Sequence, residues 1–318
     1  MIKVWIPQKV AETGTNFLRE RGYEIIEDND LSNEVMKKNI KECDAILLRT
    51  AKITKELMEE SENLKIIARH GVGYDNIDVA TAKGKGIWVT NTPTALSDSV
   101  AEYTVTGILM CSKNIWTCNK AMRKGDFFFK NENKGVDLMG KTLSIVGLGR
   151  IGRAVAKKAH FGFGMNVIAY LKSSKQETVP DYITLVDWES AFKLADFVSL
   201  HIPYTKETSG IIGRREFRWM KPTAYLINTA RGEVVKEEEL LEALIEKKIK
   251  GAFLDVLGEE PVKNNNLFWN IENVYLTPHM ASNTKECMER MALYAAMEID
   301  RVLSGQNPRW SVYPYKLN

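Results

Sequence analysis

The feature that most restricts how this chain can fold is a glycine-rich turn near its middle. The six residues from Gly147 to Gly152 read G-L-G-R-I-G, after an apolar run at 143–146 and before a helical pattern at 153–158. Between a strand and a helix, Gly147 permits a tight turn, Gly149 lets a pyrophosphate approach the backbone, and Gly152 lets the helix pack closely on the strand. Free N–H groups at the start of such a helix attract an anion. The turn therefore predicts a strand–turn–helix unit that binds a dinucleotide.

Short apolar runs alternate with helical patterns along nearly the whole chain. This alternation predicts an α/β fold with parallel sheets that are covered by helices on both faces. A long helix expected at 97–122 separates two such alternations, so we expect two doubly wound, Rossmann-like domains. Strands are expected at 3–6, 23–26, 44–48, 65–68, 87–89, 143–146, 167–170, 197–200, 224–228, 250–254 and 274–276, and a final helix at 285–303.

Composition excludes several classes of function. The 44 basic and 41 acidic residues give a net charge of +3, which is too close to balance for binding nucleic acid or a membrane surface through net charge. No apolar run reaches the ~18 residues of a membrane-spanning helix, and we expect no secretory leader. The cysteines form no C-x-x-C pair, so we expect reduced thiols in a cytoplasmic protein and no metal site. They are Cys43, Cys111, Cys118 and Cys287.

The residues that follow the strand expected at 167–170 bear on which dinucleotide binds. A carboxylate normally stands there, about 20 residues after the glycine turn, and accepts a hydrogen bond from the ribose 2′-hydroxyl. This chain instead has Leu171, Lys172 and Ser173. Without a carboxylate a 2′-phosphate is not repelled, and Lys172 with Ser173 can bind one. We therefore expect NADP in preference to NAD; in the alternative, Leu171 packs on the adenine and NAD binds.

Polar side chains with complementary chemistry follow three successive strands in the second half of the chain. They are Arg231, Asp255, Glu260 and His279. Because ligands bind at the carboxyl ends of parallel strands, we expect these side chains to face one crevice. An arginine can hold a carboxylate, and a histidine beside a carboxylate can pass a proton. Beside a nicotinamide, this set suits the transfer of one hydride and one proton between a 2-hydroxy acid and a 2-keto acid.

Further motifs occur in a fixed order along nearly the whole chain. They are His70-Gly71-Val72-Gly73-Tyr74-Asp75-Asn76-Ile77-Asp78, Thr90-Asn91-Thr92-Pro93, Ala101-Glu102, the glycine turn, Leu200-His201-Ile202-Pro203, Met220-Lys221-Pro222, Asn228-Thr229-Ala230-Arg231-Gly232, Asp255-Val256, Glu260-Pro261 and Thr277-Pro278-His279. In this order they resemble the D-isomer-specific 2-hydroxyacid dehydrogenases, a family that contains phosphoglycerate dehydrogenase and the hydroxypyruvate and glyoxylate reductases.

The resemblance implies a role for each matching residue. Arg231 grips the substrate carboxylate, His279 is the acid and base, and Glu260 pairs with His279. Val72 and Gly73 offer main-chain groups to the substrate. The resemblance implies that Arg150 and Ile151 lie along the pyrophosphate, that Thr208 and the turn with Thr229 and Ala230 line the cofactor, and that Asp255 accepts a hydrogen bond from the carboxamide. The other residues expected at the cofactor are Gly147, Gly149 and Gly152 of the glycine turn, Leu171, Lys172 and Ser173 after the next strand, and His201 and Pro203.

The resemblance also implies the architecture and the partners. A nucleotide-binding domain at 100–284 is inserted into a flavodoxin-like substrate domain formed by 1–99 and 285–318. Members of the family are usually dimers through the nucleotide-binding domain. The aromatic run Phe127-Phe128-Phe129 suits such a subunit contact, although a strand edge or a packed loop is the alternative. This chain departs from the family pattern at Leu171, where the usual acid is missing.

Two arginines bear on which 2-hydroxy acid is the substrate. Arg49 and Arg69 follow strands of the expected substrate domain, where phosphoglycerate dehydrogenases resemble this chain. They suit a second anionic group on the substrate; the alternative is surface ion pairing. The missing acid at Leu171 points instead to an NADPH-linked reductase of glyoxylate or hydroxypyruvate. A dinucleotide-sensing co-repressor is the competing function, and formate oxidation is a third, although it requires a glutamine where Pro278 stands.

Overall fold

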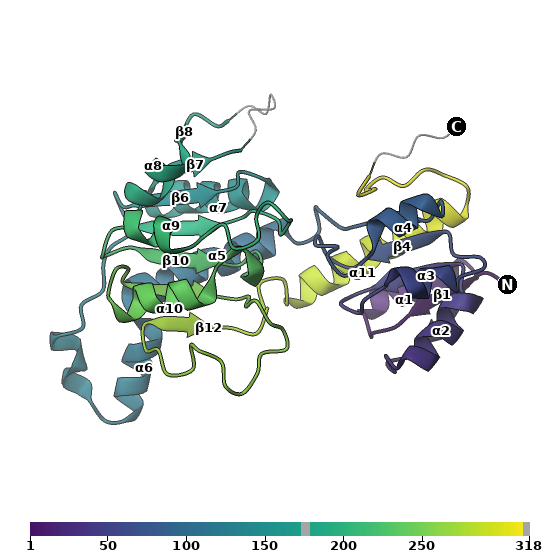
Figure 1. Cartoon of the computed structure of the whole chain (residues 1–318), viewed down its shortest axis with the longest axis horizontal. Coiled ribbons are helices and arrows are strands. Elements are labelled where there is room, and N and C mark those ends of the chain that lie inside the picture. The colour runs from purple at the N-terminus through teal and green to yellow at the C-terminus, as the bar shows by residue number, and fades with distance from the viewer. Residues whose placement is uncertain (173–178, 314–318) are drawn as a thin grey trace. The chain divides into compact units, whose positions relative to one another are not determined.

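The computed structural model describes residues 1–172 and 179–313, and the chain divides into two compact units (Figure 1). One unit is formed by residues 1–96 together with the C-terminal stretch from Asn283. The other is the continuous segment Ser97–Ser282, which is therefore inserted into the first. Each unit is built on its own parallel sheet.

The N-terminal unit has a five-stranded sheet in the order β2-β1-β3-β4-β5. Every neighbouring pair is parallel, and this order is that of flavodoxin. One face is covered by α1 and α11 and the other by α2, α3 and α4. The strands are β1 Lys3–Ile6, β2 Glu24–Glu27, β3 Ala45–Leu48, β4 Ile66–Arg69 and β5 Trp88–Thr90; the helices are α1 Glu12–Glu20, α2 Asn33–Glu42, α3 Lys55–Glu59, α4 Val79–Gly84 and α11 Lys285–Leu303.

The inserted unit has a seven-stranded parallel sheet in the order β12-β11-β10-β9-β6-β7-β8. This is the Rossmann order, extended by one strand beside β11. Helices α5 and α7 cover one face, and α8, α9 and α10 cover the other. The strands are β6 Thr142–Val146, β7 Asn166–Tyr170, β8 Ile183–Leu185, β9 Phe197–Leu200, β10 Tyr225–Asn228, β11 Gly251–Leu254 and β12 Val274–Leu276; the helices are α5 Ser97–Lys113, α6 Ile115–Arg123, α7 Arg150–Phe163, α8 Trp188–Lys193, α9 Arg214–Trp219 and α10 Glu237–Ile245, with short 3-10 helices η1 Phe127–Asn131 and η2 Gly232–Val234.

The α/β class and the parallel sheets are as the sequence predicts, but two details differ. The long helix expected at 97–122 is broken into α5 and α6 at Asn114, whose φ is 52°. Asparagine tolerates this left-handed conformation better than most residues. The helical pattern of the sequence continues on both sides of Asn114, so the sequence predicts one helix where the structure has two. The short edge strand β8 was not predicted, because only Ile183 of its three residues is buried.

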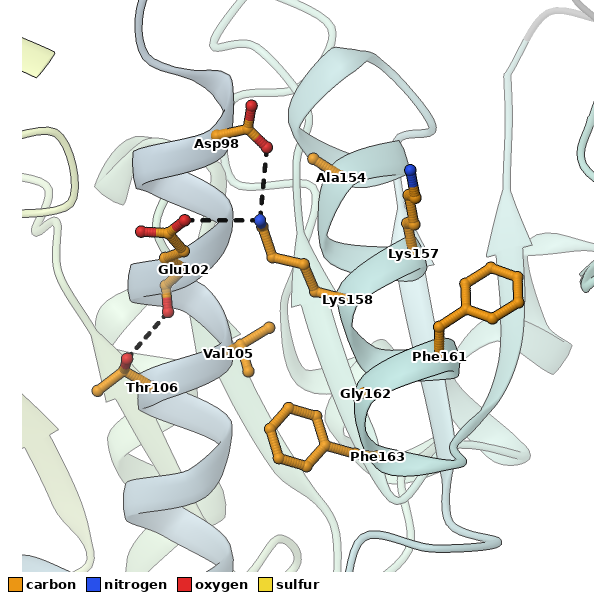
Figure 2. A pocket seen from close by; sticks show the side chains of 10 residues that line it. All are labelled: Asp98, Glu102, Val105, Thr106, Ala154, Lys157, Lys158, Phe161, Gly162 and Phe163. Carbon is orange, nitrogen blue, oxygen red and sulfur yellow. Dashed lines mark hydrogen bonds and ion pairs between the residues drawn. The ribbon is translucent and has the colours of Figure 1, made fainter.

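The helix that follows the glycine turn is anchored to α5. The Nζ atom of Lys158 on α7 lies 3.4 Å from Asp98 and 3.6 Å from Glu102, both on α5 (Figure 2). Below this ion pair Val105 and Phe163 line a surface hollow of about 600 Å³ between the two helices (Figure 2). These contacts link α7 to α5.

The three consecutive phenylalanines lie in η1, not at a strand edge. Phe127 and Phe128 are 55% and 72% exposed and touch edge to face, so the run is not a packed loop either. Trp116 and Met122 on the adjoining α6 are also about half exposed. Thr117 in the first turn of α6 hydrogen-bonds to Tyr275 on β12, and α6 and η1 lie at one end of the inserted unit (Figure 1). The exposed side chains of the segment α6–η1 present an apolar surface to its surroundings.

Candidate active site

Two glycines of the turn at 147–152 are required by the protein itself. Gly147 has a φ of 100°, and a Cβ atom there would lie 2.6 Å from the carbonyl oxygen of His201. A Cβ atom on Gly152 would lie 2.4 Å from the carbonyl oxygen of Gly147. Both distances are far inside normal contact, so the close approach of β6, α7 and the loop after β9 depends on these glycines.

Gly149 has a different role, because nothing in the described protein lies within 4 Å of the position of its missing Cβ. It is the N-cap residue of α7, a helix of 14 residues, and no side chain in the described chain caps this helix. The first N–H groups of α7 therefore face open space together with the positive end of the helix dipole. Arg150 is exposed beside them and Ile151 is half-buried. This arrangement fits a pyrophosphate.

Leu171 directly follows β7, at the position where the dinucleotide-binding motif usually has a carboxylate. Leu171 packs against the apolar core on the α5–α7 side, and Lys172 is exposed. Ser173 lies outside the described residues. A carboxylate does approach from another loop: the pKa of Glu207 is lowered, first by the hydroxyl of Thr205 and also by the charge of Lys172. Sequence reasoning missed Glu207, because no spacing rule links it to Lys172.

The loop after β9 is braced by its own polar groups. The hydroxyl of Thr208 donates to the carbonyl oxygen of Pro203 at 2.7 Å and accepts from the amide of Thr205 at 2.7 Å. His201 Nε2 lies 2.9 Å from the hydroxyl of Ser199, and burial of the ring lowers the pKa of His201 to about 3. His201 is therefore neutral at physiological pH, and its hydrogen bond with Ser199 holds the ring in place.

The turn that carries Arg231 is held by side chains on two sides. The amide of Asn228 donates to the carbonyl oxygen of Arg231 at 2.8 Å and accepts from the N–H of Ala230 at 3.0 Å. The hydroxyl of Thr229 lies 2.8 Å from the hydroxyl of Thr104 on α5. The half-buried guanidinium of Arg231 donates to the carbonyl oxygen of Ala230 at 2.8 Å. These bonds hold the turn where β10 ends, with Arg231 at its exposed side.

Glu260 and His279 form a direct pair. Oε2 of Glu260 lies 2.8 Å from Nδ1 of His279, and Oε1 accepts from the amide of Leu257 at 3.1 Å. Burial acts to raise the pKa of Glu260, but the hydrogen bond and charge of His279, the amide of Leu257 and the charge of Arg231 outweigh it and lower the pKa. The carboxylate is thus ionised at neutral pH. Because Glu260 occupies Nδ1, the other ring nitrogen, Nε2, is the one that a substrate can reach.

Asp255 holds the turn on which His279 lies. Its carboxylate accepts from the hydroxyl of Thr277 at 2.6 Å and from the amides of Met280 at 2.7 Å and Ala281 at 2.9 Å. Its carbonyl oxygen accepts from the amide of His279 at 2.8 Å. Burial raises the pKa of Asp255 despite these hydrogen bonds. The carboxylate is fully buried and engaged by this turn, and its contact with a carboxamide stays a prediction.

These loops meet at one edge of the sheet because β10, β11 and β12 are neighbours that end level. The register pairs Asn228 with Leu254 and Leu254 with Leu276. A Cβ atom on Gly232 would lie 1.9 Å from the carbonyl carbon of Leu257, so the turn after β10 packs directly on the loop after β11. The structure thus brings the segments of Arg231, Glu260 and His279 together, and the pair of Glu260 and His279 is explicit.

The remaining predicted residues lie at the carboxyl edge of the sheet in the N-terminal unit. Strands β3 and β4 pair Leu48 with Arg69, so Arg49 directly follows β3 and Arg69 is the last residue of the neighbouring β4. Both contact backbone oxygens: Arg49 donates to Lys9 at 2.9 Å, and Arg69 donates to His70.

The main-chain segment beyond His70 is also held in place. The amide of Asn91 donates to the carbonyl oxygen of Val72 at 2.9 Å. Val72 and Gly73 are half-buried. Arg49, Arg69, Val72 and Gly73 thus all belong to the loops at one edge of this sheet.

Two kinds of feature are absent from the described residues. No cluster of three or more histidine, cysteine, aspartate or glutamate side chains there has the arrangement of a metal site. No helix among the described residues combines the length and apolar character needed to cross a membrane.

Comparison with known proteins gives the family. A sequence model described as "D-isomer specific 2-hydroxyacid dehydrogenase, NAD binding domain" matches residues 105–281. The glyoxylate reductase of Thermococcus litoralis is 42% identical over 318 residues, covering 96% of this chain and 95% of that protein. The D-3-phosphoglycerate dehydrogenase of Methanocaldococcus jannaschii is 40% identical over 309 residues, covering 96% of this chain and 58% of that protein.

A solved structure agrees. The TT0316 protein from Thermus thermophilus superposes with a TM-score of 0.89 at 34% identity, covering 98% of this chain and 100% of that chain. The fold is that of a dinucleotide-dependent oxidoreductase. The chain belongs to the D-isomer-specific 2-hydroxyacid dehydrogenase family. It is an NAD(P)-dependent enzyme that acts on the CH–OH group of 2-hydroxy acids, and a dinucleotide-sensing co-repressor is not favoured.

Proposed function

We propose that this enzyme reduces small 2-keto acids of the glyoxylate and hydroxypyruvate type. The observation that carries the proposal is the 2.8 Å contact between Glu260 and His279, made by segments that pack beside the Arg231 turn. Reduction of a ketone needs a proton at the carbonyl oxygen and a cation at the neighbouring carboxylate. An imidazolium held by a carboxylate supplies the first and a guanidinium the second.

We propose roles that rest on this geometry for Arg231, Glu260 and His279 and on the family resemblance for the other residues. Arg231 binds the substrate carboxylate, and His279 donates a proton from Nε2 to the carbonyl oxygen while Glu260 stabilises the protonated ring. The nicotinamide, when bound, supplies the hydride. Main-chain groups of Val72 and Gly73 bind the substrate, and the glycine turn with Arg150 and Ile151 holds the pyrophosphate. The loops of His201–Thr208 and Thr229–Ala230 line the rest of the cofactor.

The cofactor is proposed to be NADPH rather than NADH. Leu171 stands where a carboxylate would repel a 2′-phosphate, and the exposed Lys172 offers a cation at the same place. Glu207, whose pKa is lowered in part by Lys172, supplies a competing negative charge from the loop after β9. The preference for NADPH is therefore expected to be partial rather than absolute.

A second candidate substrate class rests on Arg49 and Arg69. Arg49 directly follows β3 and Arg69 ends the neighbouring β4, at one edge of the N-terminal sheet. Such a pair suits a phosphate, sulfonate or second carboxylate, so a substrate of the 3-phosphoglycerate type is the alternative. Arg49→Ala and Arg69→Ala would then raise the KM for phosphohydroxypyruvate and leave the KM for glyoxylate nearly unchanged.

We also propose a homodimer in the cytoplasm. The exposed aromatic side chains of α6 and η1, including Trp116, Phe127 and Phe128, would be buried by a second copy of the chain. The four cysteines are all free thiols, as a reducing compartment requires. Light scattering of the wild type and of Phe128→Asp tests the dimer: the variant is expected to shift toward the monomer.

The function is tested by following nicotinamide absorbance with glyoxylate, hydroxypyruvate, pyruvate and phosphohydroxypyruvate, each with NADH and NADPH. We expect the highest kcat/KM with glyoxylate or hydroxypyruvate and NADPH. Turnover of phosphohydroxypyruvate above both would favour the second substrate class. No turnover of any 2-keto acid with either nucleotide would overturn the proposal.

A further inference from the structure

The loop that carries Glu260 has one buried end and one exposed end. Leu257 is 7% exposed and packs in the core on the α8–α10 face, whereas Gly258 to Glu260 are exposed. On the buried side the backbone of Gly232 lies against Leu257 and Gly258 so closely that no Cβ atom fits. The exposed side needs a separate anchor, because an unanchored loop would let the carboxylate of Glu260 drift from His279.

A half-buried carboxylate supplies this anchor. Glu237 is the first residue of α10, and its Oε1 accepts from the amide of Gly258 at 2.6 Å. In the described chain no other hydrogen bond of the Gly258 amide is found. The sequence alone does not single out Glu237, because neither its position on α10 nor its distance from Arg231 along the chain is unusual. Its partner is a main-chain group, which leaves no trace in the sequence.

The two neighbouring amides of the loop are thus taken by two different carboxylates. The amide of Leu257 donates to Oε1 of Glu260, while the amide of Gly258 donates to Oε1 of Glu237. The second oxygen of Glu260 faces Nδ1 of His279. The N–H of Gly258 and the N–H of Leu257 belong to consecutive peptides, so a displacement of the backbone at 257–258 also shifts the donor to Oε1 of Glu260.

We propose that Glu237 is a positioning residue of the active site, which fixes the 257–260 loop so that Glu260 stays in contact with His279. The inference deepens the proposed function and rests on the roles given there to Glu260 and His279. It adds a residue on α10, behind the loop, that touches neither substrate nor cofactor.

The surroundings of Glu237 show what holds a carboxylate in this place. Burial raises its pKa, as do the nearby charges of Glu238, Glu233 and Glu260, and the hydrogen bond from Gly258 opposes them. The first turn of a helix favours a negative charge, which partly offsets this repulsion. The hydrogen bond is thus the specific interaction that keeps the side chain turned toward the loop.

Because an amide oxygen can accept the same hydrogen bond, the role is separable from the charge. Glu237→Gln keeps the acceptor and removes the charge, whereas Glu237→Ala removes both. The neighbouring Glu238 is exposed and belongs to the same first turn of α10. Glu238→Ala therefore removes one negative charge from this turn without touching the loop and is the matched control.

The experiment measures kcat, KM and the pH profile of 2-keto acid reduction for the wild type and the three variants, with thermal unfolding to show that each is folded. For Glu237→Ala we expect kcat to fall about tenfold, a loss of ~1.4 kcal/mol of transition-state stabilisation. We also expect the pH at which the rate falls to move to lower values, with the KM for the nucleotide unchanged. Glu237→Gln and Glu238→Ala are expected to stay within about twofold of the wild type.

Two results would overturn the proposal: an unchanged pH profile in Glu237→Ala, or a loss in Glu237→Gln as large as in Glu237→Ala. A crystal structure of each variant gives a readout that does not depend on turnover. The contact between Glu260 and His279 should persist in Glu237→Gln and be broken in Glu237→Ala. If the wild type reduces no 2-keto acid but the contact still breaks, the proposed function fails while the positioning role of Glu237 stands.

Discussion

His70 and His279 lie in comparable places in the two units, but they differ in burial and in the charged groups around them. Each follows a strand at the carboxyl edge of a parallel sheet. His70 is buried, its Nε2 lies 3.3 Å from the carbonyl oxygen of Met288, and burial with the charges of Arg69 and Arg49 lowers its pKa to about 4. The side chain of His279 is 48% exposed and pairs with Glu260. Burial among cations disfavours the protonated form of His70, whereas exposure beside a carboxylate suits His279 to the proposed role of proton donor.

The largest effect is expected from removing the exposed histidine. His279→Gln should lower kcat by about 10²–10⁴-fold, the usual contribution of a general acid, with nucleotide affinity nearly intact. His160→Gln is the control, because His160 stacks on Tyr182 away from the predicted site residues. Steady-state kinetics and a nucleotide titration check both. A His279→Gln enzyme that retained wild-type kcat would remove the assigned difference between the two histidines.

The next effect concerns the carboxylate that only His279 has. The pKa of Glu260 is lowered in the folded protein, so the group is ionised at neutral pH and stabilises a protonated ring. Glu260→Gln removes this charge at every pH, and kcat for reduction at neutral pH should fall by about tenfold, a loss of ~1.4 kcal/mol of transition-state stabilisation. Glu259→Gln, which removes a neighbouring exposed charge paired with Lys263, should leave kcat unchanged. Equal kcat in the wild type and Glu260→Gln would separate the pair from catalysis.

These two predictions rest on residues that the sequence could indicate. Arg231, Glu260 and His279 each follow a predicted strand, and the order of parallel strands brings such positions to one edge. The sequence could not show that Glu237 holds the loop of Glu260 or that Asp255 holds the turn of His279, because the partners of both carboxylates are mostly main-chain amides. Nor could it show the break at Asn114, since helical periodicity runs on through α6.

A smaller effect is expected at Leu171, where we expect the adenosine ribose of the nucleotide to bind. Leu171→Asp restores the missing carboxylate, which repels a 2′-phosphate and accepts from a 2′-hydroxyl. The ratio of kcat/KM for NADPH to that for NADH should fall by about tenfold, or ~1.4 kcal/mol. Leu171→Asn introduces a side chain with the shape of aspartate but without its charge, and it should change this ratio less. Equal ratios in the wild type and Leu171→Asp would remove the argument for NADPH.

The smallest effect concerns stability and the buried histidine. Because the pKa of His70 falls from its ordinary 6.5 to about 4 on folding, the unfolded chain binds the proton more readily. Its contribution makes the protein less stable as pH falls from about 7 toward 4. Between pH 7 and pH 6 the expected loss is roughly 0.7 kcal/mol from this residue. Denaturant unfolding of the wild type and His70→Asn at both pH values measures it, and equal pH dependence in the two proteins would contradict the assignment.

The central claim is that Arg231, Glu260 and His279 act together on a 2-keto acid. A crystal structure with the nicotinamide nucleotide and oxamate, an unreactive analogue of such an acid, tests it most directly. The account predicts that the carboxylate of oxamate lies on the guanidinium of Arg231 and that its carbonyl oxygen lies within hydrogen-bond distance of Nε2 of His279, with Nδ1 still on Glu260. Oxamate bound beside the nicotinamide without contact to Arg231 and His279 would contradict it.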